Sequence, residues 1–185
     1  MTKEIIIGLE ERMKKSISNL QREFAAIRTG RANVTMFDKI NIDVYGTMMP
    51  LNQVATISIP EPRLVVIQPW DKGNLASIEK AILKSDLSLN PTNDGNLVRI
   101  QIPDLTEERR KEYVKMAKNK SEESKVAIRN IRRDGNELVK KAEKDKTVSE
   151  DEAKTSLDEI QKLTDKFIEE IQKFTDNKEK EILNL

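Results

Sequence analysis

Apolar positions in the first 30 residues recur at intervals of three or four. This spacing places them on one face of a helix that packs in the manner of a coiled coil. We expect this helix to fray at Gly8 and to end at Thr29-Gly30, where Gly30 can adopt the left-handed conformation of a cap. The predicted stripe consists of Ile6, Leu9, Met13, Ile17, Leu20, Phe24 and Ile27.

The same periodicity predicts two more long helices in the second half of the chain. Thr106, followed by two glutamates, is a typical N-cap for a helix over 106–144, although Gly135 inside it should cost about 1 kcal/mol relative to alanine. Ser149 and Glu152 form a capping box that begins the last helix. The expected stripes are Tyr113, Ala117, Ala127, Ile131, Leu138 and Ala142, and then Ala153, Leu157, Ile160, Leu163 or Thr164, Phe167, Ile171, Phe174 and Ile182. Because the link at 145–148 is short, the helices should form an antiparallel three-helix bundle.

The central segment has a different pattern and contains all six prolines. Alternating apolar and polar residues predict a strand over 40–45, and further strands are expected over 54–59, 64–68 and 97–102. A short helix is expected over 74–84, and turns over 46–50 and 90–95. The fold class is therefore α+β: a bundle of residues 1–29 and 105–185 interrupted by an inserted β/α domain of residues 31–103.

Two short crossings would join these domains and make a hinge. Gly30 permits unusual backbone angles on one crossing, and Pro103 restrains the other. The alternative is that both residues only form tight turns. The expected hinge consists of Thr29, Gly30 and Arg31 together with Ile102, Pro103, Asp104 and Leu105.

The amino-acid composition excludes several kinds of catalytic site. The chain has 185 residues with neither cysteine nor histidine, so thiol catalysis and a Ser–His–Asp triad are excluded. No glycine-rich phosphate loop, calcium spacing, secretory signal or apolar run of about 18–20 residues occurs. We therefore expect a cytoplasmic protein that is not an enzyme, with no cofactor, metal or membrane contact. Trp70, the one tryptophan, is expected to anchor the core or an edge rather than contact a ligand.

The net charge of +1 conceals an uneven distribution. Ten basic and three acidic residues lie between Arg109 and Arg133, whereas residues 143–185 carry thirteen acidic and eight basic ones. The two helices could therefore pair with each other inside the bundle. Alternatively, a cationic stripe formed by Lys118, Lys125, Arg129 and Arg132 could bind a phosphate backbone, with Arg28 and Arg31 adding charge near the hinge. Because no aromatic residue interleaves the stripe, binding should follow backbone and shape, and should weaken with salt.

Five motifs, in this order along the chain, resemble the ribosome recycling factor family. The resemblance extends over the whole length. The motifs are Ile27-Arg28-Thr29-Gly30-Arg31-Ala32; Asp86-Leu87 with Leu89-Asn90-Pro91; Leu105-Thr106-Glu107-Glu108-Arg109-Arg110-Lys111; Val126-Ala127-Ile128-Arg129-Asn130-Ile131-Arg132-Arg133-Asp134; and Ser149-Glu150-Asp151 with Gln161-Lys162-Leu163-Thr164-Asp165.

The resemblance implies an L-shaped, two-domain, tRNA-like molecule that binds the ribosome after termination. It implies that the bundle contacts large-subunit rRNA, that elongation factor G with GTP drives the short arm, and that the subunits then separate. By the same resemblance, Arg132 is the principal rRNA contact, Arg129 and Arg133 are its neighbours, and Arg28, Arg31 and Arg110 are further basic contacts. Gly135 departs from the alanine common in relatives, and we expect it to loosen the helix.

Two other classes of function remain open on the sequence. The chain could be a helical adaptor whose arginines pair with the third helix, or a general RNA chaperone without preference for ribosomes. The recycling interpretation also predicts a monomer.

Overall fold

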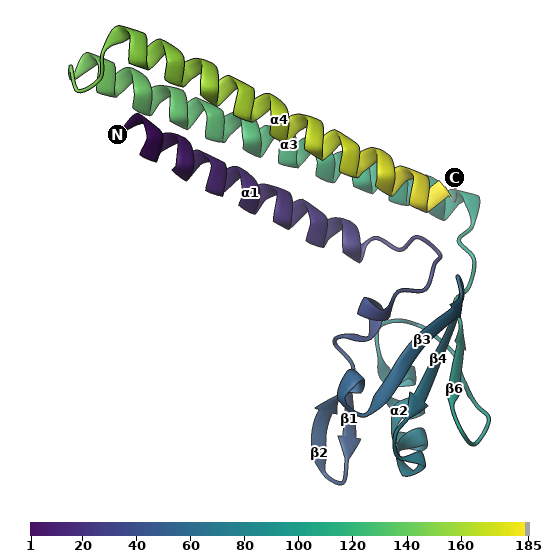
Figure 1. The fold of residues 1–185 in the computed structure, drawn as a ribbon. Coiled ribbons are helices and arrows are strands. Elements are labelled where there is room, and N and C mark those ends of the chain that lie inside the picture. Colours follow the sequence, from purple (N-terminus) through teal and green to yellow (C-terminus); the bar gives the residue numbers. More distant parts are fainter. Residues whose placement is uncertain (184–185) are drawn as a thin grey trace. The chain divides into compact units, whose positions relative to one another are not determined.

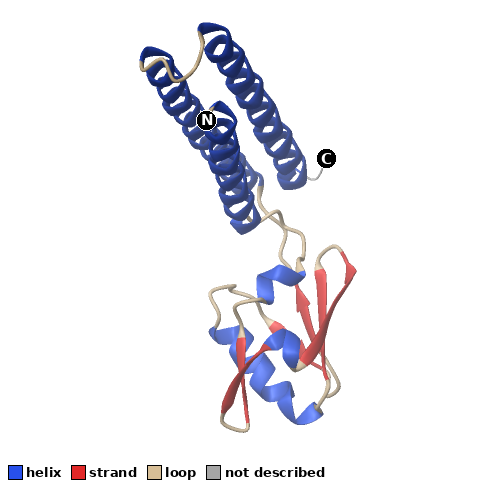
Figure 2. Ribbon diagram, turned by 60° about the vertical axis from the view of Figure 1, so that its left-hand side comes forward, coloured by secondary structure: helices blue, strands red, loops and turns tan. Residues whose placement is uncertain are grey.

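The computed structural model describes residues 1–183. The chain divides into two compact units, Met1–Thr29 with Thr106–Leu185 and, between them in the sequence, Gly30–Leu105. Among residues 1–183, the first, unit 1, contains helices and their connecting loops but no strand, and the second, unit 2, combines strands with short helices (Figures 1 and 2).

Unit 1 is a bundle of three long helices: α1 (Thr2–Ala26), α3 (Glu107–Lys144) and α4 (Glu150–Leu183). The predicted caps are confirmed. The Thr106 hydroxyl accepts the Arg109 amide hydrogen at 3.3 Å. Ser149 and Glu152 form the reciprocal capping box, in which the Ser149 amide donates to the Glu152 carboxylate and the Glu152 amide donates to the Ser149 hydroxyl. These bonds satisfy amide groups that the first helical turn leaves without partners.

Both ends of α1 differ from the prediction. The helix runs through Gly8 without interruption and ends at Ala26, because Ile27 is already extended (φ −77°, ψ 124°). Gly30 has the expected positive φ of 75°, but it lies beyond the helix and does not cap it. Ile27 is buried in the bundle core although it is not helical, so the apolar stripe continues past the end of the helix.

The buried seam of α3 also differs from the prediction. Ile128 and Val139 are buried, whereas Ala127 is only half-buried and Leu138 is 49% exposed. Ala117, Ile131 and Ala142 are buried as predicted. Ala127 and Leu138 were wrongly assigned because small and polar residues complete the buried face, which an apolar pattern does not select. The hydroxyls of Ser121 on α3 and Thr175 on α4 lie 2.8 Å apart within this seam. The buried face of α3 consists of Ala117, Ser121, Ser124, Ile128, Ile131, Gly135, Val139 and Ala142.

Gly135 does not loosen α3, contrary to the expectation. The helix is continuous around it, and Leu9 of α1 occupies the space where a side chain would lie. A Cβ atom built on Gly135 would lie 2.3 Å from Leu9 Cδ1. The glycine therefore permits close approach of α1 and α3, although it has a lower intrinsic helix propensity than alanine.

Unit 2 contains a four-stranded antiparallel sheet of order β3-β4-β6-β5, formed by β3 (Ala55–Glu61), β4 (Leu64–Pro69), β5 (Pro91–Asn93) and β6 (Val98–Gln101). A separate hairpin pairs β1 (Asn41–Val44) with β2 (Thr47–Pro50), and α2 (Leu75–Lys84) packs between hairpin and sheet. Short 3₁₀ helices lie at Val34–Phe37, Leu51–Gln53 and Lys72–Asn74. The largest buried side chains of this core include Phe37, Ile42, Ile67, Ile78, Ile82 and Ile100.

Two predictions for this segment were wrong, and one of the two alternatives given for Trp70, a place in the core, was also wrong. The expected turn at 46–50 is strand β2, because Tyr45 and Gly46 make the reversal alone with positive φ values of 50° and 86°. The expected turn at 90–95 includes the short strand β5. Trp70 is 68% exposed, and its indole nitrogen donates to the Thr56 hydroxyl at 3.0 Å, so it is not a core anchor.

Candidate nucleic-acid interface

Three arginines occupy one turn of α3. Arg129 and Arg132 are half-buried and Arg133 is exposed, while Ile128, just before them, and Ile131, between them, are buried in the bundle core. The two buried isoleucines fix the rotation of the helix about its axis. The arginines are therefore held at fixed angles to the core, with Arg132 beside α4, on a rigid element that suits recognition of a fixed shape.

The arginine charges are not neutralised by carboxylates. Nη1 of Arg132 donates to Oε1 of Gln161 on α4 at 3.4 Å, and Nε2 of Gln161 donates to Asp165 at 2.8 Å. Across residues 1–183, no ion pair joins Arg129, Arg132 or Arg133 to an acidic side chain. Arg132 thus rests against a neutral amide, and its positive charge stays available to an anionic partner.

The lysines of the predicted stripe, unlike the arginines, have acidic partners within the bundle. Lys118 lies 3.8 Å from Glu179 of α4. Lys125, whose side chain is only 13% exposed, donates to Gln172 at 2.7 Å and pairs with Glu122. Pairing within the bundle therefore accounts for these two lysines and does not account for the arginines.

An acidic neighbour of the cluster is neutralised from α1. Asp134 follows Arg133 directly, and its carboxylate forms a 2.6 Å ion pair with Arg12. Sequence analysis missed this contact because the partners are 122 residues apart and no local motif links them. The pair offsets the one carboxylate adjacent to the arginines, so the surface remains cationic.

The other basic residues of the prediction do not join this cluster. Arg110 lies 19 residues earlier on α3, about 28 Å away along the helix, and donates to the Ile182 carbonyl on α4 at 3.3 Å. Arg28 is exposed just beyond α1, and Arg31 belongs to unit 2. The structure therefore brings together three of the six predicted arginines.

The two crossing segments are tied to unit 2 by the turn between β3 and β4. The Ala32 amide donates to the Pro62 carbonyl at 2.7 Å, and the Ile102 amide donates to the Arg63 carbonyl at 2.8 Å. The Arg63 guanidinium also forms an ion pair with Asp104. Sequence analysis did not single out Arg63, which has no motif around it. These bonds hold both crossings to the same point of unit 2.

Comparison with known proteins identifies the family. The family model for ribosome recycling factor matches residues 20–183. The chain belongs to the ribosome recycling factor family. It is 56% identical to the ribosome-recycling factor of Carboxydothermus hydrogenoformans and 54% identical to that of Clostridium perfringens, in each case over 185 residues and 100% of both chains.

Solved structures agree with this assignment. A solution structure of ribosome recycling factor has a TM-score of 0.78 at 42% identity, covering 100% of this chain and 98% of that one. A second neighbour, with a TM-score of 0.65 at 46% identity and 99% coverage of each chain, is titled as models of the Thermus thermophilus factor and Escherichia coli elongation factor G bound to a post-termination complex. The α+β fold class and the family resemblance are thereby confirmed.

Ribosome recycling factors are translation factors rather than enzymes. No group of three or more acidic residues that could hold a metal ion occurs among residues 1–183. None of the helices in that part of the chain is long and apolar enough to cross a membrane.

Proposed function

We propose that the protein binds the post-termination ribosome through contacts between unit 1 and large-subunit rRNA. With elongation factor G and GTP, it then separates the subunits, so that mRNA and tRNA are released and reused. The GTPase partner supplies the energy. The neighbour titled as a recycling factor with elongation factor G on a post-termination complex supports this proposal.

The observation that carries the proposal is the cluster Arg129, Arg132 and Arg133, which has no carboxylate partner among the described residues. Such a cluster is unfavourable in isolation because like charges repel, and a polyanion relieves that repulsion. The planar guanidinium also donates two parallel hydrogen bonds to a phosphate, which an ammonium group cannot do. RNA backbone is the polyanion that matches this arrangement without requiring aromatic stacking.

Gln161 is a positioning residue in this proposal. Its amide oxygen accepts from Arg132 while its amide nitrogen donates to Asp165, so the amide cannot rotate without losing a hydrogen bond. Gln161 therefore orients Arg132 without neutralising it. A carboxylate at the same position would pair with the arginine and compete with phosphate for it, and it would lose the hydrogen bond to Asp165.

We also propose that the crossings Thr29-Gly30-Arg31 and Ile102-Pro103-Asp104-Leu105 act as the hinge used during recycling. The ties at Ala32, Ile102 and Asp104 fix one end of each crossing to unit 2, so backbone rotation is concentrated at Thr29, Gly30 and Arg31 on the first crossing and at Leu105 on the second. Gly30 contributes a positive φ of 75° and packs against Leu105, where an added Cβ would lie 3.3 Å from Leu105 Cγ. Hinges of this kind absorb backbone rotation over a few residues at the ends of elements.

The proposal is tested by splitting post-termination ribosomes with the protein, elongation factor G and GTP, followed by light scattering. Arg132→Ala should leave the fold intact, because a surface substitution costs within about 0.5 kcal/mol. It should weaken ribosome binding by about 1–3 kcal/mol, equivalent to roughly 5- to 150-fold, if charge-assisted hydrogen bonds are lost. Arg99→Ala in unit 2 is the matched control and should bind ribosomes normally.

The alternatives predict different results. An adaptor whose arginines serve the bundle would lose thermal stability in Arg132→Ala and would not bind ribosomes. A general RNA chaperone would bind unrelated RNA as tightly as ribosomes and would show the same salt dependence for both. Failure of the wild-type protein to split ribosomes with a cognate elongation factor G would refute the recycling function.

A further inference from the structure

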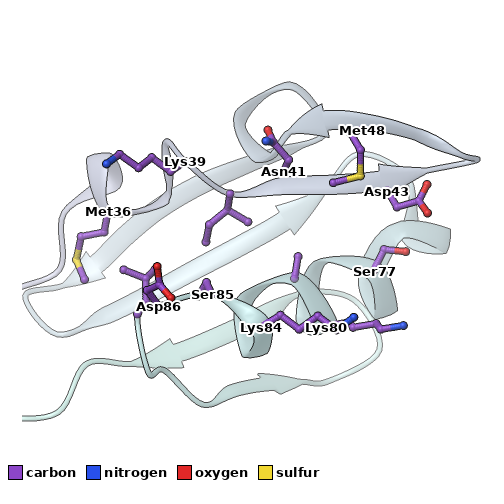
Figure 3. A pocket seen from close by; sticks show the side chains of 13 residues that line it. Met36, Lys39, Asn41, Asp43, Met48, Ser77, Lys80, Lys84, Ser85 and Asp86 are labelled. Atoms are coloured by element: carbon purple, nitrogen blue, oxygen red, sulfur yellow. The ribbon is translucent and has the colours of Figure 1, made fainter.

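A groove in unit 2 lies between the β1–β2 hairpin and helix α2. Its volume is about 580 Å³, within the range of about 300–1,000 Å³ typical of ligand sites. Figure 3 shows side chains from the hairpin, including Asn41, Asp43 and Met48, on one side and Ser77, Lys80 and Lys84 from α2 on the other. The arginine cluster of unit 1 is not part of this groove, so the proposed rRNA contacts leave it unexplained.

The edge of β1 faces this groove with unused backbone hydrogen-bonding groups. In the hairpin, the Val44–Thr47 pair closes the two-residue turn, and the Leu51 amide donates to the Ile40 carbonyl at 3.0 Å. Because hydrogen-bonded pairs alternate along antiparallel strands, residues 40, 42 and 44 bond toward β2. The amide and carbonyl groups of Asn41 and Asp43 therefore point away from β2, and both residues line the groove.

The other edge of the hairpin cannot accept a strand in the same way. Pro50 lies opposite Asn41 and ends β2. It has no amide hydrogen, and its place in the register puts the missing group on the outer edge of β2. The hairpin thus has one edge interrupted by proline and one edge with its backbone groups intact, and the intact edge is the one beside the groove.

The side chains around the groove define what could bind there. Ile40, Ala81 and Leu87 contribute apolar surface, and Lys39, Lys80 and Lys84 contribute three positive charges. Among residues 1–183, none of these lysines forms an ion pair. Two aspartates oppose them, of which Asp43 already accepts the Gly46 amide at 2.8 Å. No aromatic side chain lines the groove, so stacked nucleic-acid bases have no surface to contact.

We propose that this groove binds an extended, acidic and partly aliphatic segment of a protein partner, which adds to the edge of β1 as a third strand. Backbone hydrogen bonds to Asn41 and Asp43 provide affinity, as in other cases of strand addition. Alternate side chains of the segment then contact the apolar surface, and its carboxylates face Lys80 and Lys84. The site is independent of the proposed rRNA interface, so either proposal can fail without the other.

The test is an NMR titration of the full-length, ¹⁵N-labelled chain with an eight-residue peptide in which valine and glutamate alternate. The amides of Asn41 and Asp43 should shift and should exchange with solvent more slowly, because they become hydrogen-bonded. The same peptide with lysine in place of glutamate should bind at least tenfold more weakly. A single-stranded RNA of eight nucleotides should leave these amides unchanged.

Variants separate the backbone and charge contributions. Lys80→Glu combined with Lys84→Glu should weaken the acidic peptide at least tenfold, whereas Lys72→Glu outside the groove should not. Asn41→Pro removes one edge amide and should abolish the exchange protection, while Asn41→Ala should retain it. The proposal is overturned if the peptide does not bind, if shifts map elsewhere, if the lysine peptide binds equally well, or if RNA perturbs the groove instead.

Discussion

Substitution of Gly135 by alanine tests the packing of α1 against α3. In an exposed helix this change stabilises by about 1 kcal/mol, because alanine has the higher helix propensity. Here the new methyl group would lie 2.3 Å from Leu9 Cδ1, 3.1 Å from Cδ2 and 3.2 Å from Cγ. Rotation about χ2 of Leu9 can move the two terminal carbons but leaves Cγ in place, and moving Cγ would require a change of χ1 within a buried site. Overpacking of this kind costs about 1–3 kcal/mol, so we expect a net destabilisation of roughly 1 kcal/mol.

A second substitution should reverse the sign of this effect. Leu9 is 2% exposed, and Leu9→Ala alone should cost about 2–5 kcal/mol through lost burial and the cavity left behind. In that background the Gly135→Ala methyl group enters the vacated space and keeps its propensity advantage. Gly135→Ala should then stabilise by about 1 kcal/mol. The two substitutions are therefore coupled by roughly 2 kcal/mol, within the range found for residues in contact.

Urea unfolding followed by far-ultraviolet circular dichroism provides the assay, because the three long helices of unit 1 dominate that signal. Gly8→Ala is the matched control: it lies within α1, and its Cβ would meet no atom within 4 Å. Gly8→Ala should stabilise by up to about 1 kcal/mol. The packing argument is refuted if Gly135→Ala stabilises the wild type as Gly8→Ala does, or if its effect is the same with and without Leu9.

Three further predictions concern other contacts. Gln161→Glu places a carboxylate against Arg132 and should weaken ribosome binding at low salt; thermal stability should change little, because the new ion pair offsets the lost hydrogen bond to Asp165 and the repulsion from it. Equal binding by the variant would contradict the role given to the neutral amide. Ser149→Ala removes the hydroxyl half of the capping box and should lower the free energy of unfolding by about 1 kcal/mol, whereas Ser149→Asp should retain most of it. Hydrogen bonds from the Asn96 and Leu97 amides hold the pKa of Asp94 below its ordinary value. The stabilisation that these bonds give the folded state is complete above the ordinary pKa of an aspartate and is lost as the pH falls through the lowered pKa of Asp94. An NMR titration of the Asp94 carboxyl should therefore give a midpoint below that of an aspartate in an unstructured peptide.

The sequence predicted the elements whose signals are local. The caps at Thr106 and Ser149 can be recognised from four consecutive residues, and long stripes of apolar residues identify all three helices of unit 1. The arginine cluster is visible in the sequence as a group because its members lie within five residues, and its role as an rRNA contact stays a prediction. The sequence could not show that the cluster lacks carboxylate partners, because that depends on which α4 residues face α3.

Contacts between distant segments account for most of the errors. Ala127 and Leu138 were wrongly assigned to the buried face of α3 because that face includes Ser121, Ser124 and Gly135, which an apolar pattern does not include. The turn at 46–50 was misassigned because Tyr45 adopts a positive φ, which is uncommon for a residue other than glycine. Trp70 was expected to anchor the core or an edge, and the sequence could not decide between the two, because its bond to Thr56 on β3 joins residues 14 positions apart.

The error at Gly135 bears directly on the proposed interface. Leu9 packs on Gly135, and Arg12 of the next turn of α1 pairs with Asp134, so two contacts between α1 and α3 lie immediately after Arg132 and Arg133. On the other side, Gln161 of α4 contacts Arg132 directly. The arginines are thus carried on a segment of α3 that both neighbouring helices restrain. Recognition of a rigid RNA backbone requires donors fixed in position, since each donor that must be ordered on binding lowers the affinity. In the proposed interface, the role of Gly135 is therefore to permit the close approach of α1 that fixes the helix on which the arginines lie, although it lowers the local helix propensity.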